Sequence, residues 1–106
     1  MKMAKYVVFI ECDSKDYDKI VPKARKSRDY REKHPENYPK IVLSAQRFLG
    51  DIPKLTKDLK GFNIIETDDL QKFVNMKVMN MPEVTTYIVP IVDLSEFQDI
   101  YLKSRK

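Results

Sequence analysis

The feature that most constrains the fold is that the strand-forming segments of this chain are apolar on both faces. Residues 4–11 (AKYVVFIE) are rich in Tyr, Val, Phe and Ile and too short for an independent helix, so they predict a buried strand. Successive side chains of a strand point to opposite faces, and here both sets are apolar. The same holds for residues 84–92 (VTTYIVPIV). Both faces of the sheet that contains these strands therefore need a cover.

Helices are predicted between and after these strands. Apolar side chains at three-and-four spacing predict a helix over residues 15–33, which either kinks at Pro22 or becomes regular only a turn earlier. Asp68 or Asp69 can cap a second helix. A final amphipathic segment starts at Ser95.

Two more strands are predicted in the middle of the chain. Residues 41–49 (IVLSAQRFL) and 62–67 (FNIIET) have strand composition. Residues 51–60 between them predict a short helical turn or an ordered loop that Gly61 closes. In the fourth strand Pro90 has no N–H for a ladder, which places that strand at a sheet edge or its end at a bulge.

The order strand, helix, strand, strand, helix, strand is that of the split β-α-β, ferredoxin-like arrangement. We therefore expect residues 1–106 to form a single ferredoxin-like α+β domain with an antiparallel sheet, the first and third strands in its middle and an extra C-terminal helix. Its two helices can cover only one face of the sheet. The other face would expose a large apolar area, so we expect a homodimer in which two sheets meet face to face as an α+β barrel.

Composition bounds the chemistry. The two glycines, Gly50 and Gly61, exclude the dinucleotide-binding fingerprint and the P-loop, and the single Cys12 and single His34 exclude the common zinc ligand sets. We therefore expect no cofactor and no metal.

No apolar run approaches the ~18 residues of a membrane span, and the first residues lack a cleavage site, so we expect a cytoplasmic protein without a membrane partner.

Positive charge gathers in one segment. The net charge is +4, and residues 15–40 hold nine of the 20 bases, among them Arg25, Arg28 and Arg31. Acids such as Asp29 interrupt this run, whereas phosphate binding favours a face of one sign. The pattern is typical of a solvated helix, and a nucleic-acid or regulatory module is therefore the third of three functions that the sequence allows.

The sharpest candidate catalytic group combines two carboxylates and an arginine. This prediction takes the first and third strands as parallel neighbours, so that Glu11 and Glu66 reach the same end of the sheet on one face. Their repulsion would raise the pKa of one carboxyl group, as in general acids and bases. Arg47 on the adjacent strand could instead neutralise both, and the group would then be a salt-bridge cluster that closes the barrel end.

Other polar side chains interrupt the apolar strands. They are Tyr6, Ser44, Gln46, Asn63 and Tyr87. A buried tyrosine is usually core with one hydrogen bond, but an apolar cavity with a few such groups is also how small-molecule pockets are built. These five are the candidate ligand-binding residues.

Three segments of the chain resemble the dimeric α+β barrel superfamily, in particular its small families of uncharacterised proteins. They are residues 5–11 (KYVVFIE), residues 61–69 (GFNIIETDD) and residues 88–92 (IVPIV). The oxygenase and haem-degrading branches, which are similar in fold, use an Asn, His and Trp set, and this chain has no Trp. Fold membership does not decide activity.

Two functions precede the nucleic-acid module in our expectation. The first is a homodimeric barrel that binds a small apolar or aromatic molecule inside the barrel. The alternative is a cofactor-independent isomerase or oxygenase that uses Glu11 or Glu66 as base and Tyr6 or Tyr87 as hydrogen-bond donor.

Overall fold

The computed structural model describes residues 3–79 and 81–105 and shows an α+β fold. Its elements are β1 (Ala4–Cys12), a 3₁₀ turn (Ser14–Asp16), α1 (Tyr17–Lys33), a second 3₁₀ turn (Pro35–Asn37), β2 (Lys40–Arg47), β3 (Leu59–Thr67), α2 (Leu70–Val78), β4 (Thr85–Ile91) and α3 (Leu94–Ser104). The predicted α+β class and the predicted C-terminal helix are confirmed. Within the described residues, no helix is long and apolar enough to cross a membrane.

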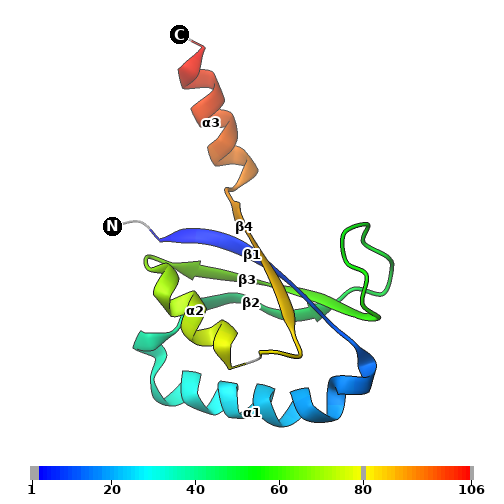
Figure 1. Cartoon of the computed structure of the whole chain (residues 1–106). Coiled ribbons are helices and arrows are strands. Elements are labelled where there is room, and N and C mark those ends of the chain that lie inside the picture. The colour runs from blue at the N-terminus through cyan, green and yellow to red at the C-terminus, as the bar shows by residue number, and fades with distance from the viewer. Residues whose placement is uncertain (1–2, 80, 106) are drawn as a thin grey trace.

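The strands form one antiparallel sheet in the order β2-β3-β1-β4 (Figure 1). The central positions of β1 and β3 confirm the prediction from the sequence, and so does the edge position of β4, the strand that contains Pro90. This sheet order is compatible with a ferredoxin-like fold.

The direction of β3 relative to β1 agrees with the expected antiparallel sheet, but not with the parallel pairing on which the predicted group of Glu11 and Glu66 depends. The two strands are antiparallel, with Lys5 opposite Glu66 and Glu11 opposite Lys60. The expected meeting of Glu11 and Glu66 at one end of the sheet is therefore wrong. Apolar alternation gives the face of a residue but not the direction of its strand, since reversing a strand preserves the alternation.

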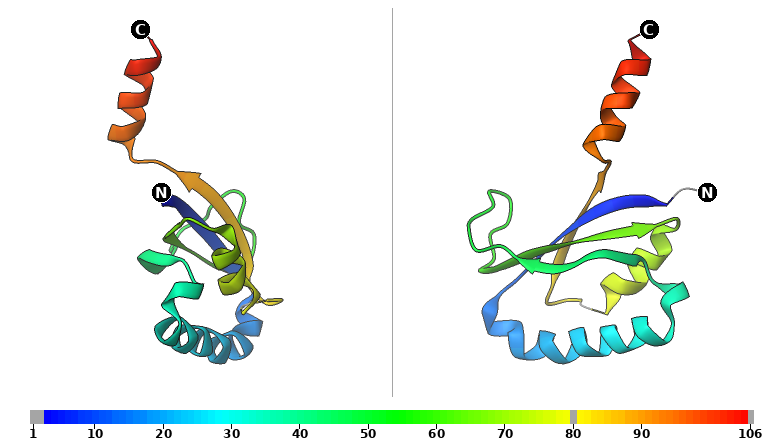
Figure 2. Two further views of the ribbon diagram at one scale, coloured as in Figure 1. Left: turned by 90° about the vertical axis from the view of Figure 1, so that its left-hand side faces the viewer. Right: turned by 180° about the vertical axis from the view of Figure 1, so that it is seen from behind.

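Helices α1 and α2 lie on one side of the sheet, which we call the helix face (Figures 1 and 2). The core there consists of Val8 and Ile65 from the sheet and Phe73 and Met76 from α2. Helix α1 runs regularly through Pro22, which has no N–H for an intrahelical hydrogen bond. It ends at Lys33, and the backbone N–H of the C-cap residue His34 donates to Tyr30 O at 2.8 Å.

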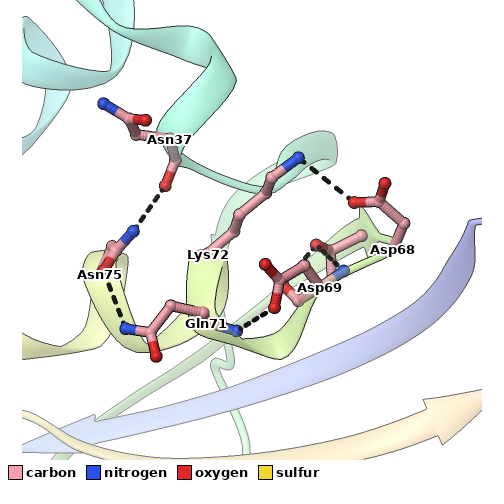
Figure 3. A network of polar contacts seen from close by, with 7 residues as sticks. Asn37, Asp68, Asp69, Gln71, Lys72 and Asn75 are labelled. Atoms are coloured by element: carbon pink, nitrogen blue, oxygen red, sulfur yellow. Dashed lines mark hydrogen bonds and ion pairs between the residues drawn. The ribbon is translucent and has the colours of Figure 1, made fainter.

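Side-chain hydrogen bonds fix the start of α2 and its link to the turn after α1 (Figure 3). The Asp69 carboxylate accepts from the backbone N–H of Gln71 at 2.9 Å, which confirms one of the two predicted caps. On the next turns Gln71 donates to Asn75, and Asn75 Nδ2 donates to Asn37 O at 2.9 Å. These contacts hold α2 against the polypeptide that leads into β2.

Gly61 lies inside β3 and does not close the preceding segment, contrary to the prediction. A Cβ atom built at this position would lie 2.5 Å from the backbone oxygen of Gln46 on β2. The pairing of β2 with β3 shifts register between Leu43 and Gln46, and the two backbones approach closely just past this irregularity. The absence of a side chain therefore permits the approach.

The side of the sheet opposite the helices is apolar, as the alternation in the sequence predicts. We call it the open face and define it by the side chains whose register places them there: Val7, Phe9, Leu43, Phe62, Ile64, Tyr87, Val89 and Ile91. In the part of the chain that the structure describes, no helix covers it (Figure 2). A loop of residues 48–58 folds over one end, where the ring of Phe48 stacks on Phe62 at 5.0 Å and Leu55 is buried.

Helix α3 extends away from the rest of the molecule, beyond the end of β4 (Figures 1 and 2). The chain consequently has a radius of gyration of 15.8 Å, against about 13 Å for a compact chain of this size. Its apolar side chains are largely in solvent, and Leu94 and Leu102 are 72% and 61% exposed.

Candidate ligand site between the helices and the sheet

A cavity of about 1030 Å³ lies between α1 and the helix face of the sheet, beside α2, which packs on the sheet through Phe73 and Met76. Its apolar walls include Val8 and Ile10 from β1, Ile20 from α1, and Phe73 and Met76 from α2. A concave, largely apolar space with a few polar groups is the usual form of a small-molecule site.

Two buried polar atoms on strands of this wall have no hydrogen-bond partner among the described residues. They are Asn63 Oδ1 on β3 and Thr86 Oγ1 on β4. Asn63 is paired with Val8, and Thr86 with Ile10, so the two side chains flank β1 on the helix face. An unsatisfied buried polar group costs about 1–3 kcal/mol, so these atoms are poised to bond to a molecule in the cavity.

Charged side chains surround the cavity. Arg25, Arg28 and Arg31 line it from α1, and Glu32 stands among them. Burial and the adjacent Arg28 guanidinium lower the pKa of Arg31, whose Nε donates to Ser27 O at 3.4 Å. The three arginines of the predicted nucleic-acid module therefore border the cavity, and the acidic Glu32 lies beside Arg31 in the sequence.

An ion pair ties α1 to the chain just before β4. Lys23 Nζ lies 2.6 Å from Glu83 Oε2 and donates to Met81 O at 3.0 Å. The Lys23 ammonium group, which donates a hydrogen bond to this carboxylate, holds the pKa of Glu83 below its usual value. This contact fixes the position of α1 over the sheet while leaving the cavity between them.

The three candidate catalytic residues do not form one group. Glu11 is 3% exposed, and its Oε1 accepts from the backbone N–H groups of Thr56 at 3.2 Å and Lys57 at 2.9 Å. Glu66 lies toward the other end of β1, opposite Lys5 and Lys40, and borders the cavity. Arg47 is exposed and pairs with Gly61. Glu11 thus anchors the loop of residues 48–58.

The candidate ligand-binding residues divide between the two faces of the sheet. Ser44 and Asn63 line the cavity, and Tyr6 packs against the core on the same side. Gln46 and Tyr87 have the register of the open face, and both are exposed. Sequence reasoning brought these residues together because it did not assign their faces relative to the helices.

Thr86 is the cavity residue that sequence reasoning missed. It is a hydroxyl residue within an apolar strand, two positions before Ile88, which packs against the core. Threonine is common in strands and so draws no notice by itself. The alternation of β4 could have identified Thr86, because it places this hydroxyl on the same face as the apolar Ile88.

Cys12 and His34 do not lie in this cavity. Burial and then the carboxylates of Asp58 and Asp13 raise the pKa of the Cys12 thiol, which disfavours the reactive thiolate. His34 caps the C-terminus of α1, and its Nδ1 lies 3.8 Å from Glu36. Among the described residues, no group of three or more His, Cys, Asp or Glu side chains could hold a metal ion.

No protein-family model, no curated protein and no solved structure matches this chain. The function of the protein is therefore inferred from its geometry.

Proposed function

We propose that this protein binds a small molecule in the cavity between the helices and the sheet. The observation that carries the proposal is the pair of buried, unpartnered atoms Asn63 Oδ1 and Thr86 Oγ1 on its wall. The ligand has an apolar or aromatic body, which suits the apolar walls. It also has a hydrogen-bond donor, because Asn63 Oδ1 can only accept.

This proposal changes the expected location of the ligand. The expectation from the sequence was a ligand inside the barrel, between two open faces. Phe9, Phe48 and Phe62 already stack there, with ring centroids 6.3 and 5.0 Å apart. The cavity on the helix face has a volume of about 1030 Å³.

The test is mass spectrometry of the small molecules released when the natively purified protein is denatured. We expect one compound in near-stoichiometric amount from the unmodified protein and at least a tenfold smaller amount from Asn63→Leu. Thr85→Val is the matched control, because Thr85 is next to Thr86 on β4 but on the opposite face. An equal yield from Asn63→Leu, or no compound from the unmodified protein, would contradict the proposal.

We further propose that two copies associate through their open faces as a dimeric α+β barrel. The element order and the sheet order β2-β3-β1-β4 support a ferredoxin-like protomer for such a barrel. Exposed Tyr87, Val89 and Ile91 support association of this face. Light scattering should give twice the monomer mass at micromolar concentration, and a monomer mass would contradict the dimer.

The other two functions have less support. A cofactor-independent isomerase or oxygenase would depend on Glu66, because Glu11 binds backbone amides of the loop. A nucleic-acid module would use Arg25, Arg28 and Arg31, and steep salt-dependent retention on DNA or RNA would favour it.

We propose a cytoplasmic location, which fractionation of cells would test.

A further inference from the structure

Helix α3 has an apolar surface that its own protomer does not cover. Four side chains at helical spacing form what we call the apolar stripe: Leu94, Phe97, Ile100 and Tyr101. All four are exposed, and the opposite side of the helix carries Asp99 and Lys103. A helix of 11 residues is marginal in water without tertiary contacts, so this stripe needs a surface to pack on.

The connection to β4 directs α3 away from its own sheet. Only Val92 and Asp93 separate β4 from α3. Asp93 is held on both sides, since its carboxylate lies 3.4 Å from Lys5 Nζ on β1 and its backbone oxygen accepts from Phe97 N–H at 2.9 Å. A connection this short and anchored does not let α3 turn back onto the open face of the same chain.

We propose that the apolar stripe of α3 packs on the open face of a second copy, and that the two copies exchange this helix reciprocally. The inference rests on the proposed dimer and changes its contact: each open face meets α3 of the partner, so that the two exchanged helices lie between the two sheets. In this arrangement one symmetric dimer buries both unpartnered apolar surfaces of each chain.

The dimensions of the two surfaces agree. Eleven residues of helix are about 16 Å long, and four strands about 4.8 Å apart span roughly 14 Å. A helix that crosses the open face therefore touches the whole width of the sheet without a large overhang.

The exposed area agrees with a stable dimer as well. The stripe and the exposed open-face residues Leu43, Tyr87, Val89 and Ile91 are 36% to 72% exposed. Aromatic side chains have roughly 150–250 Å² of surface and aliphatic ones somewhat less, so these eight, about half exposed, present on the order of 800 Å². A standard interface buries about 800 Å² per partner.

The charges also fit. Across β1, β3 and β4 the middle of the open face carries only apolar and aromatic side chains. The charged register pairs lie toward the ends of the strands, where Lys5 is opposite Glu66 and Glu11 is opposite Lys60. The apolar stripe can therefore be buried without covering an unpaired charge.

Disulfide cross-linking between two differently substituted copies tests the exchange. Both carry Cys12→Ser; one also carries Val89→Cys in the open face and the other Tyr101→Cys in the stripe, with Val7→Cys and Phe97→Cys as a second pair. After the copies are co-expressed and oxidised, we expect disulfide-linked pairs that contain one copy of each kind. A dimer in which only Tyr101→Cys copies link to each other, or in which neither pair cross-links, would overturn the exchange while leaving the dimer itself intact.

A second experiment measures the mass of full-length variants. We expect the double substitution Phe97→Asp with Tyr101→Asp to shift the protein to monomer at micromolar concentration. Lys103→Asp changes the charge by the same two units on the polar side of α3 and should leave the dimer unchanged. A dimer that persists in the double variant overturns the exchange, and a monomeric unmodified protein overturns both the exchange and the proposed dimer.

Discussion

The ammonium group of Lys23 lies 2.6 Å from the carboxylate of Glu83 and joins the middle of α1 to the segment that enters β4. Because this contact lowers the pKa of Glu83 in the folded state, its stabilising effect is present above the unfolded pKa of about 4.3. The effect is lost as the pH falls through the lower, folded pKa. We expect Lys23→Met to lower the melting temperature at pH 7 and the difference from the unmodified protein to shrink by pH 3. Thermal melts across this range test it, and a constant difference would argue against the ion pair.

Removing the unpartnered hydroxyl of Thr86 should stabilise the unliganded protein. Valine has nearly the same shape, and an unsatisfied buried polar group costs about 1–3 kcal/mol. We expect Thr86→Val to raise the free energy of unfolding by about 1 kcal/mol. Thr85→Val should not, because Thr85 Oγ1 accepts from Lys57 Nζ at 3.0 Å. Urea denaturation of ligand-free protein measures both, and a loss of stability in Thr86→Val would indicate that its hydroxyl is already satisfied.

Glu11 should control the order of the loop of residues 48–58. Its carboxylate accepts two backbone hydrogen bonds, and hydrogen bonds to charged groups contribute about 1.5–3 kcal/mol each. We expect Glu11→Ala to lower stability by about 2 kcal/mol or more and to speed hydrogen exchange at the amides of Thr56 and Lys57. Glu66→Ala is the control that should leave exchange at these amides unchanged. Unaltered exchange in Glu11→Ala would refute the anchoring role.

The two glycines should respond oppositely to alanine. Gly61→Ala places a methyl group against Gln46 O, so we expect a loss of about 2 kcal/mol as the strands are forced apart. At Gly50 no atom lies within 4 Å of the added Cβ, so alanine there should be neutral or stabilise by up to about 1 kcal/mol. Denaturation midpoints compare them, and equal effects would contradict the close approach of β2 and β3.

Much of the fold follows from local patterns in the sequence. Apolar alternation predicts both faces of β1 and β4, Asp69 predicts the start of α2, and Pro90 predicts the edge strand. These features succeed because each depends on neighbours in the chain. The alternation does not encode the direction of β3 relative to β1, which agrees with the expected antiparallel sheet and contradicts the parallel pairing assumed for Glu11 and Glu66.

The candidate site was predictable only in part for the same reason. Asn63 stands out as a polar residue in an apolar strand, and the structure places it on the cavity wall. The prediction that Glu11, Glu66 and Arg47 form one group is wrong. Because β3 runs antiparallel to β1, Glu66 lies at the opposite end of the sheet from Glu11. Thr86 joins Asn63 only through two different pairings with β1, which no local pattern reveals.

Pro90 has one more consequence. It lies on β4, at the rim of the sheet, where a strand from another chain could otherwise add to the ladder. A proline cannot donate a backbone hydrogen bond, and a proline on an edge strand therefore hinders pairing with a strand of another chain. The molecule thus combines a sheet surface that invites a partner with one edge strand that resists the addition of a further strand.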